Sequence, residues 1–88
     1  MQADRGKINR LLKTARGQID GILKMVEEDR YCIDISQQLM ATEAILKKAN
    51  KEILTAHLKN CIRNADTDEE REEKVDELVA MLEIGRAS

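Results

Sequence analysis

The fold of this chain is decided by the stretch from residue 34 to residue 64, which reads DISQQLMATEAILKKANKEILTAHLKNCIRN. Its apolar positions repeat with a strict 4-3 spacing over three heptads, which predicts one long helix with Asp34 as its N-cap. The repeat consists of Ile35, Leu39, Thr42, Leu46, Ala49, Ile53 and Ala56. A second apolar flank runs beside the repeat, so this helix has to be covered on more than one side. We expect a preceding helix of the same chain on one side and another protomer on the other.

A first helix is predicted from about Ala3 or Asp4 to about Glu28. Its apolar stripe recurs every three to four residues. The stripe consists of Ile8, Leu11, Ala15, Ile19, Ile22 and Val26. Gly17 and Gly21 are unfavourable inside a helix, but the periodicity continues through them. We therefore expect these glycines to be points of close helix approach.

A third, shorter helix is predicted after residue 66. Thr67 and Glu70 form the pattern of a capping box at its start, and Gly85 is expected to end it. The residues expected to face inward are Val75, Leu78, Val79 and Leu82. Since no strand pattern is visible, the sequence predicts an all-α chain with three helices.

The composition limits the class of protein. The chain has 88 residues, which we take as a single domain over residues 1–88. It has no Phe or Trp, so its core has to be built from aliphatic side chains, and a chain of this size commonly needs a metal or a partner chain. No signal-peptide or membrane-spanning pattern is present, and two cysteines make no disulfide framework, so we expect a cytoplasmic protein.

The charge is distributed unevenly along the chain. Residues 1–64 carry 12 Lys/Arg against 8 Asp/Glu, whereas residues 65–88 carry 3 against 9. The slightly negative total therefore conceals a basic first part and an acidic C-terminal segment. This asymmetry permits a basic face on the first two helices.

The two cysteines and the single histidine suggest a metal site. His57 and Cys61 are four residues apart, which places them on one face of a helix. Cys32 lies 29 residues before Cys61, roughly 43 Å along a continuous helix, so a shared site requires Cys32 from an antiparallel second chain. Two thiolates and one imidazole favour Cu(I), whereas zinc normally takes a fourth ligand. The alternative is that Cys61 is a core residue and His57 a surface residue without a metal.

Basic residues recur along both long helices. They are Lys7, Arg10, Lys13 and Arg16 on the first helix and Lys47, Lys48 and Lys51 on the second. Such side chains either contact nucleic-acid phosphates or form an ordinary solvated face. No helix-turn-helix, zinc-finger or basic-zipper pattern decides between these two readings.

Two further residues are candidates for contacts around a metal site. Tyr31, the only aromatic residue, adjoins Cys32, and its hydroxyl either forms a hydrogen bond near the metal or fills the helix junction. Glu77 on the third helix is either an acceptor for a metal ligand or a solvated charge. No phosphate-binding glycine loop, nucleophile elbow or catalytic carboxylate pair is present, so we expect no enzyme.

Two segments carry a family resemblance: INRLLKTARGQIDGILKMVEEDRYCIDISQQLMA, which begins at Ile8, and HLKNC, which begins at His57. Nearly the whole chain resembles the CsoR/RcnR family of bacterial repressors. The hallmarks are the run from Arg16 to Gly21 and the Tyr31–Cys32 junction. The set of Cys32, His57 and Cys61 is similar to the Cys-His-Cys pattern of the copper-sensing branch.

The resemblance implies an antiparallel four-helix bundle at a dimer core and a tetramer formed from two dimers. It implies operator DNA as the partner of the basic faces, with Arg16 at a DNA-contact position. It further implies Cu(I) bound by Cys32 of one chain and by His57 and Cys61 of its partner, with Tyr31 and Glu77 around the ligands. Cu(I) binding would then release the DNA that the metal-free repressor holds.

Other branches of the family resemble this chain less well. Nickel and cobalt sensors have a histidine near the N-terminus and formaldehyde sensors have a Pro-Cys-His arrangement, and this chain has neither. Persulfide sensors keep both cysteines but lack the histidine, so His57 favours copper. A persulfide-sensing repressor nevertheless stays as an alternative, because two facing thiols can be bridged by sulfur chemistry. A helical interaction module without a ligand is the alternative from another class.

Overall fold

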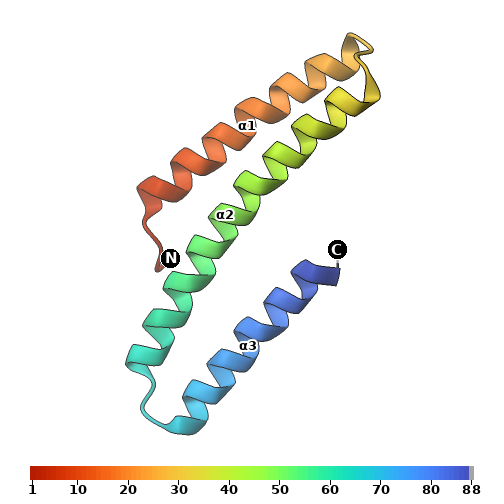
Figure 1. The fold of residues 1–88 in the computed structure, drawn as a ribbon. Helices are drawn as coiled ribbons and strands as arrows, with labels where there is room; N and C mark the ends of the chain where they lie inside the picture. The colour runs from red at the N-terminus through yellow and green to blue at the C-terminus, as the bar shows by residue number, and fades with distance from the viewer. Residues whose placement is uncertain (88) are drawn as a thin grey trace. The chain divides into compact units, whose positions relative to one another are not determined.

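The computed structural model describes residues 1–87, except for the side chains of Leu82 and of residues 84–87. The backbone forms three helices, α1 (Arg5–Glu27), α2 (Cys32–Asn64) and α3 (Asp68–Ala87), joined by short connections (Figure 1). The prediction of an all-α chain with three helices is confirmed. Among the described residues, no helix combines the length and apolarity needed to cross a bilayer.

The two ends of α1 are fixed by local hydrogen bonds. At the N-terminus, the Asp4 carboxylate accepts hydrogen bonds from the backbone N–H groups of Gly6 (2.9 Å) and Lys7 (3.3 Å), which is the geometry of an N-cap. At the C-terminus, Asp29 adopts a left-handed conformation with φ of 55°. The following N–H, that of Arg30, donates to the carbonyl of Met25 at 3.0 Å, which closes a Schellman motif.

The start of α2 differs from the prediction. Asp34 was expected as the N-cap, but the helix already begins at Cys32, and the N–H of Ile35 donates to the carbonyl of Tyr31 at 3.2 Å. Asp34 therefore lies in the first turn, where a carboxylate is stabilised by the helix dipole. The helix then continues without interruption to Asn64, because it contains neither Pro nor Gly.

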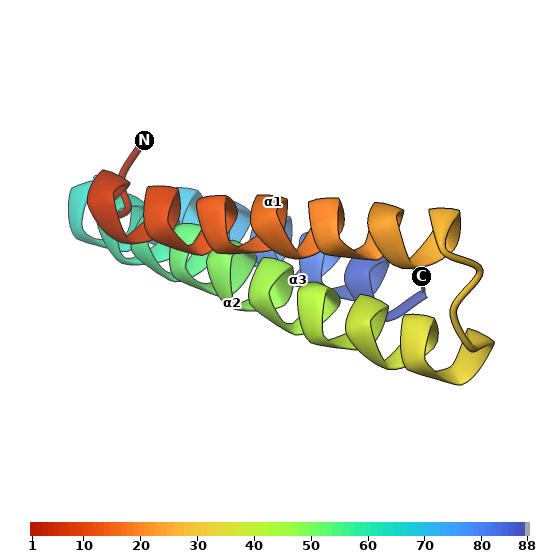
Figure 2. The same cartoon turned by 90° about the horizontal axis from the view of Figure 1, so that it is seen from above.

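The backbone divides into two compact units, of which the first is Asp4–Glu52. In it, α1 runs antiparallel beside the first part of α2, as both views show (Figures 1 and 2). Its small core consists of Ile8, Ala15, Ile22, Thr42 and Ala49. Thr42 and Ala49 belong to the predicted 4-3 repeat, so this side of the repeat faces α1 as expected.

Much apolar surface of this unit is exposed. The exposed positions include Leu12, Ile19, Leu23, Leu39 and Leu46. Gly17 and Gly21 are open as well, because a Cβ atom added at either position would meet nothing within 4 Å. Among the described residues, the close helix approach expected at these glycines does not occur.

The second unit contains the chain from Ile53 onward together with Met1–Ala3. Its helix α3 is capped as predicted by Thr67, whose hydroxyl accepts from the N–H of Glu70 at 3.1 Å. The reciprocal bond of the capping box is displaced by one residue, since the Glu70 carboxylate accepts from the N–H of Asp66 at 2.9 Å. Gly85 does not end the helix, which runs to Ala87.

The predicted inward face of α3 is only partly covered. Leu78 is half-buried, whereas Val75 and Val79 are exposed. The fourth predicted residue, Leu82, lies outside the described side chains. The helix is therefore apolar on a face that its own unit covers incompletely.

Candidate metal centre and nucleic-acid interface

The structure brings together two of the three predicted metal ligands. The Nε2 atom of His57 and the Sγ atom of Cys61 are 3.5 Å apart. Both residues lie on α2, one turn apart, so the helix itself brings the two side chains together. His57 is exposed and Cys61 is half-buried, so the pair is accessible at the surface of its unit.

The third predicted ligand, Cys32, is an exposed free thiol at the first position of α2. Because α2 is unbroken, 29 residues of helix separate Cys32 from Cys61. Within the part of the chain that the structure describes, no three His, Cys, Asp or Glu side chains are grouped to hold a metal ion. One chain therefore supplies a two-donor pair, a thiol and an imidazole, which are ligand types that suit soft ions such as Cu(I).

The two residues expected around the metal are both exposed. Tyr31 lies in the connection between α1 and α2, directly before Cys32. Glu77 on α3 is paired with Lys74 one turn away, with 3.8 Å between their charged atoms. In its own unit, Glu77 thus has a cationic partner on α3.

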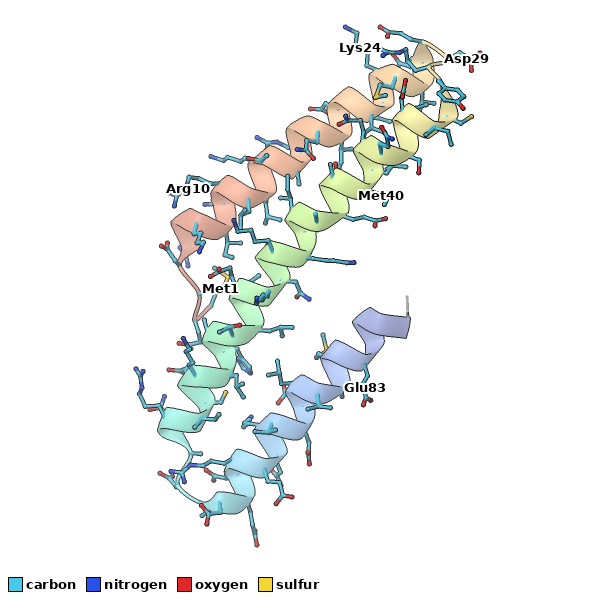
Figure 3. The ribbon with its side chains drawn as sticks, viewed as in Figure 1. Met1, Arg10, Lys24, Asp29, Met40 and Glu83 are labelled. Atoms are coloured by element: carbon cyan, nitrogen blue, oxygen red, sulfur yellow. The ribbon has the colours of Figure 1, made fainter. Side chains whose placement is uncertain are left out.

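Six of the seven predicted basic residues are exposed: Arg10, Lys13, Arg16, Lys47, Lys48 and Lys51. The side chain of Arg10 projects from α1 on the side away from α2 (Figure 3). The members on α1 are three residues apart, and each such step turns by about 300° around the helix. They therefore wind across the surface, and Lys7 and Arg16 lie on opposite sides of α1.

The seventh basic residue, Lys7, is in a different environment. It is half-buried, and its Nζ atom lies 2.9 Å from Oε1 of Glu52 on α2. The hydrogen bond from Lys7 and its positive charge lower the pKa of Glu52 below the ordinary value, and Lys48 and Lys51 lower it further. Glu52 is not among the residues predicted from the sequence, although it is the only acidic residue between residues 44 and 65.

Comparison with known proteins identifies the relatives of this chain. The family described as "Metal-sensitive transcriptional repressor" matches residues 4–83. The copper-sensing transcriptional repressor CsoR of Mycobacterium ulcerans (strain Agy99) is 44% identical over 75 residues, which is 85% of this chain and 63% of that protein. The protein of the same name from Bacillus subtilis (strain 168) is 36% identical over 76 residues, 86% of this chain and 75% of the relative. The chain thus spans less than two thirds of the length of the mycobacterial relative.

Two solved structures have the same fold. The crystal structure of the copper-sensing repressor CsoR with Cu(I) from Geobacillus thermodenitrificans NG80-2 superposes with a TM-score of 0.78 and 33% identity, over 92% of this chain and 84% of that one. The nickel-responsive transcriptional regulator InrS superposes with a TM-score of 0.76 and 29% identity, over 94% and 93% of the two chains.

The three-helix fold and these similarities place the chain in a class of helical transcriptional regulators. More specifically, the chain belongs to the metal-sensitive transcriptional repressor family, the CsoR/RcnR family. The resemblance found in the sequence is confirmed. The family is one of repressors and not of enzymes, in agreement with the prediction.

Proposed function

We propose that this protein is a Cu(I)-responsive transcriptional repressor that binds operator DNA without metal and releases it when Cu(I) binds. The observation that carries this proposal is the 3.5 Å approach of His57 Nε2 to Cys61 Sγ on one face of α2. Several relatives are named as copper-sensing repressors, which supports Cu(I) as the inducer.

The proposed site is shared between chains. Cys32 of one chain joins His57 and Cys61 of its partner, because the length of α2 keeps Cys32 from the pair on its own helix. Two thiolates and an imidazole supply soft ligands for a three-coordinate Cu(I) ion. Tyr31 and Glu77 are proposed to hold the ligands in position through hydrogen bonds.

A second chain is also favoured by the apolar surface that one chain leaves exposed. Leu39 and Leu46 on α2 belong to the 4-3 repeat but are not covered by α1. Apolar side chains in such a repeat are commonly covered by a second helix pair. We therefore propose a homodimer built on α1 and α2 and, from the family resemblance, a tetramer of two such dimers.

The proposed DNA interface consists of the basic residues of the first two helices. They are Lys7, Arg10, Lys13, Arg16, Lys47, Lys48 and Lys51. Metal and DNA are then negatively coupled ligands of one assembly, and a coupling of about 3 kcal/mol weakens DNA binding roughly 150-fold. In this scheme Cu(I) joins the end of α2 in one chain to the start of α2 in its partner. This changes the position of the basic residues relative to the DNA and weakens binding.

Two other inducers are compatible with the same scaffold. Both thiols are free and Cys32 is exposed, which is favourable for a persulfide sensor. The nickel-responsive InrS has a similar fold at 29% identity.

The identity of the inducer is tested directly. A duplex that the protein binds is selected from random DNA, and Cu(I), Ni(II) and a persulfide donor are added separately to the complex. We expect release by Cu(I) alone, and release only by either of the others would overturn the copper assignment. Failure to retain any duplex at moderate salt would instead favour a ligand-free helical module.

The shared site is tested by mixing two defective variants. Cys32→Ala and Cys61→Ala are each expected to lose tight Cu(I) binding. When the two chains are unfolded and refolded together, half of the dimers are mixed and each mixed dimer has one complete site, so about a quarter of the wild-type capacity should return. Measurement is by Cu(I) titration against a chelator. If no tight binding returns, the site is not formed between chains.

A further inference from the structure

The ion pair between Lys7 and Glu52 differs from every other ion pair among the described residues. It joins α1 to α2 across 45 positions of sequence, with 2.9 Å between Nζ and Oε1. The other pairs link residues no more than four positions apart. Among the residues that the structure describes, Lys7 is thereby the one member of the proposed DNA-binding set whose charge is engaged by a carboxylate.

Glu52 stands in an otherwise basic part of α2. It follows Lys51 directly and lies one turn after Lys48, and both lysines belong to the proposed DNA interface. Its pKa is lowered, chiefly by Lys7, so this carboxylate stays ionised at neutral pH. An ionised carboxylate within this basic stretch is therefore available to engage the ammonium group of Lys7.

We propose that Glu52 limits the affinity of the protein for non-specific DNA by engaging the ammonium group of Lys7. Non-specific binding comes from cations that replace the counterions of the phosphates. A lysine that is neutralised within the protein releases no counterion, so each chain contacts one phosphate fewer. Where the affinity for the operator is kept, lower non-specific affinity raises the ratio of specific to non-specific binding, which governs occupancy of an operator among many competing sites. This inference rests on the proposed function, since it presupposes that the protein binds DNA.

The competing interpretation is that the pair only clamps α1 to α2. Both side chains are about 40% exposed, at 42% and 39%, and exposed ion pairs contribute little to stability. Glu52→Gln is therefore expected to fold, which allows its DNA binding to be measured. Glu43→Gln is a matched control, because Glu43 is an exposed residue of the same helix and has no ion pair among the described residues.

The test measures binding of wild type, Glu52→Gln and Glu43→Gln to a random-sequence duplex over a range of salt concentrations. For each chain that contacts the duplex, we expect Glu52→Gln to bind about fivefold to tenfold more tightly at ~0.1 M salt, with a salt slope steeper by about 0.9. Glu43→Gln should keep the wild-type slope. Equal behaviour of the two variants would overturn the inference.

A double variant separates engagement of Lys7 from simple repulsion by Glu52. In the Lys7→Gln background, the further change Glu52→Gln should give no gain in affinity, because no lysine is left to release. A gain that persists without Lys7 means that Glu52 repels phosphates directly and overturns the inference. Failure of the wild type to bind any duplex would overturn the proposed function as well, whereas normal binding without an effect of Glu52→Gln overturns this inference alone.

Discussion

The hydroxyl of Thr42 on α2 donates a hydrogen bond of 2.8 Å to Oε1 of Gln18 on α1. Thr42 is buried, and it is the only polar residue among the described buried side chains. The bond to Gln18 forms in only one alignment of the two helices, so it favours this register of α1 against α2, while the same hydroxyl also lies 3.1 Å from the carbonyl oxygen of Gln38 within α2. Gln18 lies two residues after Arg16, so the same contact determines where that arginine stands on the surface.

Replacement of Thr42 by Val should destabilise the protein by about 1 kcal/mol, because the shape is kept while Gln18 loses its partner. The measurement is urea denaturation at a fixed chain concentration. Thr14→Val is the matched control. The Thr14 hydroxyl donates to the carbonyl of Arg10, one turn earlier, at 2.9 Å, as the Thr42 hydroxyl can to that of Gln38, but Thr14 is exposed and makes no hydrogen bond to α2 among the described residues. An equal loss of unfolding free energy in both variants would show that the hydrogen bond between Thr42 and Gln18 contributes nothing to stability.

Replacement of Asp29 by Gly should stabilise the protein by about 0.5–1 kcal/mol. Asp29 has φ of 55°, where a Cβ atom is strained, and glycine removes that strain. In contrast, Asp20→Gly should destabilise the protein by about 0.5 kcal/mol, because Asp20 lies inside α1. Thermal unfolding of the two variants side by side tests this, and a destabilised Asp29→Gly would contradict it.

Replacement of His57 by Ala should separate metal binding from release of DNA. The two thiolates keep part of the Cu(I) affinity. The bond from the metal to the imidazole on α2 is lost, and with it the coupling of metal binding to release of DNA. Cu(I) titration against a chelator and operator retention are measured on the same sample. Thr55→Ala, an exposed change on the same helix, should leave both properties unaltered. Unchanged copper-driven release in His57→Ala would remove His57 from the switch.

Replacement of Arg16 by Ala should weaken DNA binding and reduce its salt slope by about 0.9 for each chain in contact. Arg16 is exposed on α1 and has no ion pair among the described residues. Arg71→Ala on the acidic helix α3 serves as the control, since Arg71 is already paired with Asp68 at 3.2 Å. An unaltered slope for Arg16→Ala would exclude this residue as a phosphate contact.

The contribution of Glu52 to stability should depend on pH. The Lys7 partner lowers the pKa of Glu52 in the folded chain, so the pair stabilises the fold above the pKa of the unfolded carboxyl group. This contribution is lost as the pH falls through the lower pKa of the folded state. Denaturation of wild type and Glu52→Gln should therefore differ slightly near neutral pH and agree in acid. A difference that grows in acid would contradict the assignment of the ion pair.

The sequence predicted the local features of the fold well. The bounds of α1, the end of α2 and the Thr67 cap follow from periodicity and short-range hydrogen bonds, which act over a few residues. The start of α2 was missed because Asp34 is favourable both as an N-cap and in the first turn. The meeting of His57 and Cys61 was also predictable, since one helix carries both.

What the sequence by itself determined is therefore the set of helices and the pair of donors that a single helix aligns. Only the tertiary structure decided that Lys7 meets Glu52, that Thr42 meets Gln18, and that Leu39 and Leu46 remain exposed on a single chain. The two contacts join residues that are 24 and 45 positions apart in the sequence. The exposure of the two leucines depends on which side of α2 is covered by α1. The physical reason is that helix periodicity is a local property, whereas the register between two helices is set by the packing of side chains across their interface.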